Sequence, residues 1–118
     1  MRRHVFLIAT ALGLAASAVS AEFSKVDNQS EFVALVAGKT LGRPFIRLEV
    51  SPEGTISGTG AAWEVSGNWT WNDGYFCRNL VWGGDELGYN CQRVDVRGGK
   101  IRFTSDRGTG DSAEFTVR

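Results

Sequence analysis

The feature that most constrains the fold is a change of hydrophobic period at Leu41. From there onward, apolar and polar residues alternate in short runs that are separated by Gly, Pro, Asn and Asp. A period of two places one face of each run against a core, as in β-strands, and the runs recur about every 8 to 12 residues. This spacing predicts a mainly β domain of about seven or eight strands, either a small antiparallel up-and-down barrel or a sandwich.

Residues 28–37 are the one segment with helical spacing, because their apolar side chains recur at i, i+3 and i+4. Asp27 or Asn28 can cap this segment. If Asn28 is the cap, Glu31 falls at the third helical position and completes a capping-box-like pair. Gly38 then supplies the stop. We therefore expect one N-terminal helix beside the strands.

Residues 1–21 have the pattern of a cleavable secretory signal peptide. Two arginines precede an apolar stretch over residues 5–19, and Val19-Ser20-Ala21 is a small-residue cleavage site. Removing 21 of the 118 residues leaves 97, which are enough for one small domain over residues 22–118. Residues 23–26 would precede the helix as a short extended arm.

The composition of residues 22–118 excludes several kinds of chemistry. The only histidine, His4, lies in the signal peptide, so the mature chain has neither a histidine-based nucleophile nor an imidazole metal ligand. We expect no cofactor and no metal. Nucleic acid is disfavoured because no basic cluster is present. No apolar run after Ala21 approaches the length of about 18 residues that a membrane span requires. The sequence predicts a periplasmic or secreted monomer.

Cys77 and Cys91 are expected to form a structural disulfide, because an exported chain meets an oxidising compartment. Closing a loop of about 15 residues would stabilise the fold by about 3 kcal/mol in the chain-entropy estimate. A redox-active pair would favour a C-x-x-C spacing instead, and two thiols alone are a poor zinc site.

The two cysteines are symmetric about a tip at residues 83–85, which predicts a hairpin. If its strands pair without a bulge, the cysteines face each other and Val81 lies opposite Leu87. A bulge at the tip would instead move the bridge to a diagonal or a non-adjacent strand. Both faces of the hairpin are apolar, so we expect a closed barrel to cover one face and the helix to cover part of the other.

The face opposite the cysteines supplies the candidate binding site. Alternation places Phe76, Arg78 and Trp82 on this face, and Tyr89 comes from the facing strand. Trp82 lies beside the tip, where burial is harder, so contact with a partner or ligand competes with packing. The guanidinium of Arg78 can pair with a carboxylate ligand or stack on Trp82, or it can be a solvated or salt-bridged sheet residue. No catalytic residue is predicted.

The other three tryptophans are Trp63, Trp69 and Trp71. We expect them in the core, because a small barrel needs large side chains to fill it. The alternative is an aromatic cleft for a sugar, a peptide or another flat ligand.

Three segments carry a resemblance to known proteins: GNWTWNDGYFCR at residues 67–78, LGYNCQ at 87–92 and RFTSD at 102–106. With them, the chain resembles a family of small exported bacterial proteins without an established activity. Some members carry the name dihydrodipicolinate reductase, which implies a nicotinamide-binding Rossmann domain. This short, mostly β sequence lacks the G-x-G-x-x-G turn of such domains and does not support that name. In fold, the chain is also similar to small disulfide-bearing periplasmic barrels that inhibit proteases or lysozymes.

These observations favour an exported, non-enzymatic binding or inhibitor-like module whose partner is an unknown small ligand or envelope protein. The rival hypothesis is a histidine-independent hydrolase that uses Asp and Glu. It requires two carboxyl groups roughly 5 to 9.5 Å apart in one cleft. A structural envelope protein is the third hypothesis.

Overall fold

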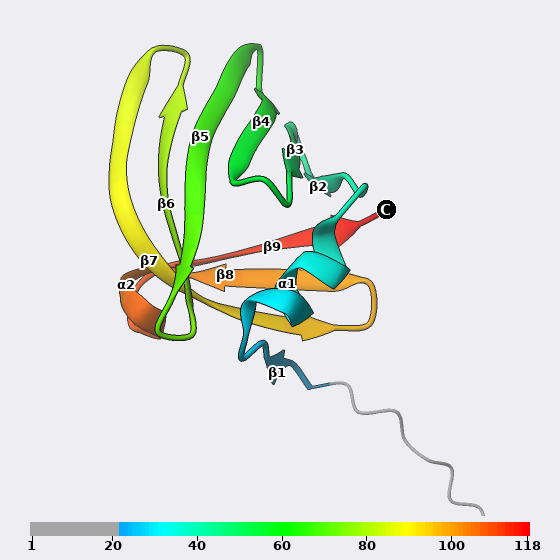
Figure 1. Ribbon diagram of the computed structural model, residues 1–118. Coiled ribbons are helices and arrows are strands. Elements are labelled where there is room, and N and C mark those ends of the chain that lie inside the picture. Colours follow the sequence, from blue (N-terminus) through cyan, green and yellow to red (C-terminus); the bar gives the residue numbers. More distant parts are fainter. Residues whose placement is uncertain (1–21) are drawn as a thin grey trace, which may run out of the picture.

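The computed structural model describes residues 22–118, so the predicted signal peptide lies outside the described residues. One antiparallel sheet dominates the fold (Figure 1). Its strands are β1 (Ser24–Lys25), β2 (Leu41–Arg43), β3 (Ile46–Val50), β4 (Thr55–Gly60), β5 (Trp63–Asn72), β6 (Tyr75–Trp82), β7 (Asp85–Arg97), β8 (Lys100–Thr104) and β9 (Ser112–Val117). The helices are α1 (Gln29–Val36) and α2 (Ser105–Gly108).

The sheet closes on itself as a barrel of eight strands, from β7 through β6, β5, β4, β3, β2, β9 and β8 back to β7. Neighbouring strands are antiparallel throughout. The prediction of a mainly β, antiparallel barrel with an N-terminal helix is therefore confirmed. The expected extended arm is β1, an additional strand that pairs with β7.

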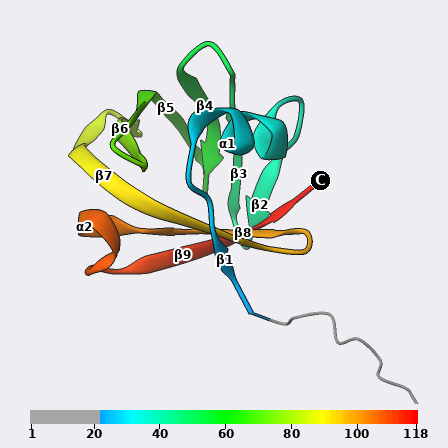
Figure 2. The same cartoon turned by 60° about the horizontal axis from the view of Figure 1, so that its bottom comes forward.

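Strand β7 joins the two sides of the barrel because its halves have different neighbours. Its first half pairs with β6, and its second half pairs with β8 on one edge and with β1 on the other. Figure 2 shows β7 running as one long strand from the side of β6 to the side of β8. The hairpin of β6 and the first half of β7 therefore extends beyond the short strands β8 and β9.

Helix α1 begins and ends as its sequence predicts. The side chain of Asn28 accepts a hydrogen bond of 2.9 Å from the backbone N–H of Glu31. The Glu31 carboxylate in turn accepts one of 3.1 Å from the backbone N–H of Asp27. These bonds satisfy N–H groups that the helix itself leaves unpaired. After the helix, Gly38 has a φ of 72°, a conformation that favours glycine.

One face of α1 closes an end of the barrel instead of covering the outer face of the hairpin, where the sequence placed it. The Phe32 side chain is fully buried and inserts among aromatic rings that point inward from the strands. Its ring centroid lies 5.0 to 5.3 Å from three of these rings and 6.3 Å from a fourth. The four residues are Trp69, Trp71, Phe76 and Phe103.

The predicted disulfide is present, and it joins directly opposed residues of β6 and β7. Only the end of the hairpin near the tip differs from the prediction. Its tip is a two-residue turn of Gly83 and Gly84, and a bulge shifts the register so that Val81 faces Glu86 instead of Leu87. Without the bulge, the two-residue tip would place Cys77 opposite Asn90. The extra residue shifts the register by one and brings Cys91 opposite Cys77.

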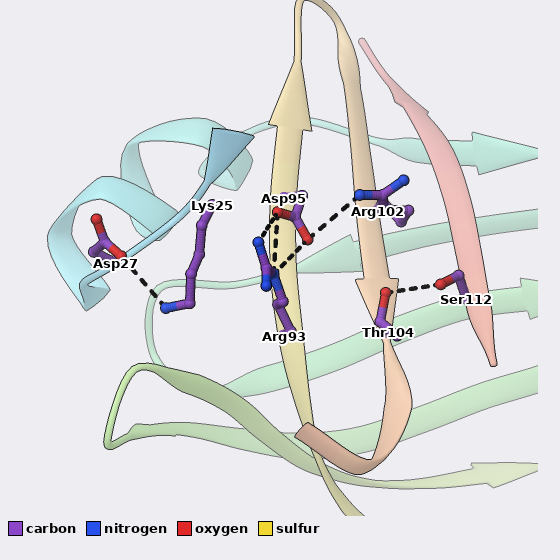
Figure 3. Close-up of polar contacts among 7 residues, drawn as sticks. All are labelled: Lys25, Asp27, Arg93, Asp95, Arg102, Thr104 and Ser112. Atoms are coloured by element: carbon purple, nitrogen blue, oxygen red, sulfur yellow. Dashed lines mark hydrogen bonds and ion pairs between the residues drawn. The ribbon is translucent and has the colours of Figure 1, made fainter. Parts of the chain in front are cut away.

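A buried carboxylate lies behind the N-terminal strand. Asp95 is 1% exposed, and its oxygens accept hydrogen bonds of 3.1 to 3.2 Å from Arg93. Arg102 lies 3.7 Å away on the other side (Figure 3). Arg102 also stacks on the ring of Phe23, 4.1 Å from its centroid, and so does Arg97 at 4.6 Å. These contacts dock the segment that carries β1 on the outside of the barrel.

The second helix, α2, connects β8 to β9. Asp106 and Arg107 have φ values of 55° and 56°, so this single turn is not a regular α-helix. The side chain of Asn90 on β7 holds it in place: its amide nitrogen donates to the Asp106 carboxylate at 2.8 Å, and its oxygen accepts from the Asp106 N–H at 2.9 Å.

Candidate functional site

A cavity of about 150 Å³ lies inside the barrel and is partly open to solvent. Inward-facing side chains of seven strands form its wall, and all but two of them are apolar. The polar exceptions are Arg78 and Gln92. The apolar lining residues are Leu41, Leu48, Val50, Ile56, Phe76, Leu80, Phe103, Ala113 and Phe115.

The cavity lies next to the aromatic cluster that α1 completes. Phe76 and Phe103 belong to both, because each lines the cavity and also contacts Phe32. The helix therefore closes the barrel on one side of the cavity. Leu48 and Leu80 line it farther toward the tips of the hairpins, where the barrel has no covering helix within residues 22–118.

Arg78 is held in the cavity wall by the bulge in β7. Its Nη1 atom donates a hydrogen bond of 2.9 Å to the carbonyl oxygen of Gly88. Gly88 lies opposite Leu80, just where the register shifts. A bulge interrupts the regular ladder and can redirect polar groups near a site. Here it leaves a carbonyl free to bind the guanidinium.

The positive charge of Arg78 has no counter-charge in the described part of the chain. Among residues 22–118, no carboxylate forms an ion pair with it. Burial lowers the pKa of the Arg78 guanidinium from its ordinary value, because desolvation disfavours the charged form. An arginine nevertheless stays protonated in proteins. The cavity therefore combines an apolar wall with one uncompensated cation.

The polar groups near Arg78 are engaged with α2. Asn90 lies directly opposite Arg78 on β7, and it binds the nearby carboxylate of Asp106. Gln92 is 9% exposed and donates from Nε2 to the hydroxyl of Ser105 at 3.1 Å. Because an amide nitrogen carries two hydrogens, Gln92 keeps one further donor for the cavity.

The structure separates the four predicted site residues. Phe76 and Arg78 both line the cavity. Trp82 follows two residues after Leu80, and its indole N–H donates to the carbonyl of Gly60 at 3.0 Å. Tyr89 is largely exposed, and its hydroxyl lies 3.6 Å from the sulfur of Cys91. Phe76 and Arg78 thus share a site, Trp82 lies at the edge of the barrel, and Tyr89 lies by the disulfide.

The prediction that three tryptophans fill the core is right for Trp69, which is 4% exposed, and wrong for Trp63, which is 56% exposed. Trp71 is partly buried. All three face the same side of β5, but this strand extends past the barrel core, so its first residue reaches the edge. There Trp63 packs edge-to-face on Trp82, with ring centroids 6.2 Å apart.

We call Phe45, Trp63 and Trp82 the aromatic rim. Phe45 is 85% exposed, and its carbonyl accepts a 2.7 Å bond from Ala61 in the turn that precedes Trp63. Gly83 lies against Trp63 so closely that a Cβ there would come within 2.9 Å of the ring. Three neighbouring turns therefore present large apolar side chains to solvent in fixed positions.

Most of the cavity wall was not predicted as a site. Leu48, Val50 and Ile56 have the period-two pattern of any buried strand face, which does not distinguish a packed core from a cavity. Gln92 could have been found from the sequence. It follows Cys91 directly, so it lies on the opposite face of the strand, which is the face of its cross-strand partner Phe76. A polar residue at an inward position is a better indicator of a site than another apolar one.

The carboxylates do not gather in the cavity, whose lining contains no Asp or Glu residue. The buried carboxylate of Asp95 forms ion pairs with Arg93 and Arg102. Residues 22–118 also contain no cluster of His, Cys, Asp and Glu that could hold a metal ion.

No helix in the described part of the chain is long and apolar enough to cross a membrane. Comparisons with protein-family models, curated proteins and solved structures found no match. The resemblance to small exported bacterial proteins therefore stays a prediction.

Proposed function

We propose that this protein is an exported, non-enzymatic binding module that holds a small ligand inside its barrel. Export follows from the pattern of the first 21 residues and suits a disulfide-linked domain. Periplasmic or secreted localisation is part of the same proposal. The observation that carries it is the cavity between the aromatic cluster and the rim, because ligand sites are typically apolar recesses with a few polar groups.

The size of the cavity sets the scale of the ligand. An engineered cavity of about 150 Å³ in another protein binds benzene, so the enclosed part of the ligand has about the volume of one aromatic ring. A larger molecule would extend from the cavity toward solvent. Apolar lining residues from seven strands give such a ligand contacts that folding has already positioned.

Native mass spectrometry of the protein purified from an exporting host tests this function. We expect a fraction with an additional bound mass, and we expect Ala113→Leu to remove it by filling the cavity. The matched control is Ala34→Leu, the same change at an exposed position of α1. Retention of the bound mass in Ala113→Leu, or its loss in both variants, would contradict binding in the barrel.

The aromatic rim favours a second candidate function, contact with an envelope protein in the manner of an inhibitor. Tryptophan is enriched at the centres of protein interfaces, and Trp63 and Trp82 are both exposed and rigidly held. A photoreactive residue at position 63 should crosslink one defined protein in exporting cells. A residue at position 49, on the outer face of β3, should not. Equal crosslinking from both positions would argue against this function.

A further inference from the structure

We infer that the ligand of the barrel cavity is a small monocarboxylate, with its carboxylate on Arg78 and its apolar body against the inner wall. This inference rests on the proposed function and names the chemical class that the cavity selects. Its basis is the placement of a single positive charge in an otherwise apolar recess.

The charge argument starts from what surrounds the guanidinium. Arg78 donates to the Gly88 carbonyl at 2.9 Å, and no carboxylate in the described chain pairs with it. A guanidinium has five N–H donors, so the one bond to Gly88 leaves others free for a ligand. The burial that lowers the pKa of Arg78 also strengthens its attraction to an anion, because solvent screens the charge less.

Two carboxylates of the chain are already engaged by other groups. Asp106 is bound by Asn90, the residue opposite Arg78, through both its side chain and its backbone N–H. The buried acid, Asp95, is paired with Arg93 and Arg102 on the outside of the barrel. The fold therefore neutralises the charge of Asp95 internally and leaves that of Arg78, which is partly buried, for an external anion.

The geometry favours one carboxylate over two or over a phosphate. Arginine can bind either a carboxylate or a phosphate in a two-point manner, but Gln92 offers only a single additional N–H at the same wall. The remaining lining is apolar, so a second charge on the ligand would be buried without a partner, which is costly. The body of the ligand must consequently be neutral and about the size of an aromatic ring or a short alkyl chain.

Benzoate and benzamide are matched probes, since they share shape and differ in charge. Isothermal titration calorimetry on the purified, oxidised protein should give benzoate an affinity about ten- to hundredfold above that of benzamide, the effect of a charge-assisted hydrogen bond. Amide NMR shifts should change at Phe103 and Phe115, which line the cavity. Changes confined to the aromatic rim would overturn the assignment.

Substitutions of Arg78 then distinguish the contribution of its charge from that of the shape of the cavity. Arg78→Met should lower benzoate affinity to that of benzamide while benzamide binding stays within about twofold, which also shows that the variant folds. Arg78→Lys keeps the charge and should retain part of the preference for benzoate. Arg47→Gln is the control, because Arg47 lies exposed on the outer side of β3 and should not affect either probe.

The outcomes distinguish the two proposals. If benzamide binds the wild-type cavity as tightly as benzoate, or if Arg78→Met keeps the preference for benzoate, the carboxylate inference fails and the binding function stands. If neither probe binds and Ala113→Leu changes no bound mass, both fail. A preference for benzoate that disappears in Arg78→Met and persists in Arg47→Gln supports both.

Discussion

The two ends of the barrel differ in how tightly their interiors are packed. At the end closed by α1, Phe32 is fully buried among four aromatic rings. Toward the other end the interior holds a cavity and Arg78, a cation with no counter-ion among residues 22–118, and exposed tryptophans lie at the edge. Dense packing stabilises a fold, whereas unfilled apolar volume and unpaired charge lower its stability. We therefore expect the closed end to contribute more to stability than the other end, where we propose that the ligand binds.

The largest effect should come from the same substitution at the two ends. Trp69→Ala should lower the free energy of unfolding by about 3 to 5 kcal/mol, because it removes a buried indole beside Phe32. Trp63→Ala should cost about 1 kcal/mol, since this side chain is mostly exposed. Urea denaturation measures both. Equal losses would remove the distinction between the two ends.

The disulfide should have the next largest effect on stability, and it acts on the hairpin of β6 and β7 that carries Arg78. Replacing both Cys77 and Cys91 by Ser should lower the free energy of unfolding by about 3 kcal/mol, given their separation of 14 residues. Reducing the wild-type protein should reproduce this loss and should leave the double variant unchanged. A loss under about 1 kcal/mol would mean that packing alone holds this hairpin.

The N-cap of α1 tests the closed end with a smaller change. Asn28→Ala removes the 2.9 Å bond to the N–H of Glu31 and should cost about 1 kcal/mol of unfolding free energy. Gln29→Ala is the control at the adjacent exposed position. An unaffected melting temperature in Asn28→Ala would show that the packing of Phe32 fixes the helix without its cap.

Arg78→Met should have the smallest effect on stability. Removing a charge without a counter-charge and substituting an apolar side chain of similar length is often neutral or stabilising, so we expect a change within about 1 kcal/mol or a gain. The same denaturation measurement checks it. A loss of several kcal/mol would mean that Arg78 serves the fold, and the cavity would then no longer differ from the closed end.

Local features of the fold could be predicted from the sequence because their causes are local. The cap at Asn28, the stop at Gly38 and the alternation of strand residues depend on neighbouring positions. The pairing of Cys77 with Cys91 followed from their symmetry about a glycine tip. The bulge beside Gly88 could be named only as an alternative, because Asp85 and Glu86 on the tip side of it are both polar and do not reveal the change in alternation.

The candidate site was only partly predictable, because only some of its features have local causes. Alternation placed Phe76 and Arg78 on one face of the hairpin, opposite the cysteines, and the structure puts both at the cavity. It treated Trp63 and Trp69 alike, because the pattern does not reveal where a strand leaves the core. The pairing of β2 with β9 joins distant parts of the chain. This pairing determines which inward-facing residues surround the cavity, and no local pattern reveals it.

The position of β9 also affects when the protein can fold during its synthesis. It is the last strand along the chain, yet it pairs with β2 and β8, and Arg118 exchanges backbone hydrogen bonds of 2.9 and 3.1 Å with Thr40. Contacts between such distant residues form slowly, and until they form two strand edges stay open. A nascent chain therefore cannot complete its barrel before residues 112–118 emerge. That delay favours threading through a secretion channel in an unfolded state, as the proposed export requires.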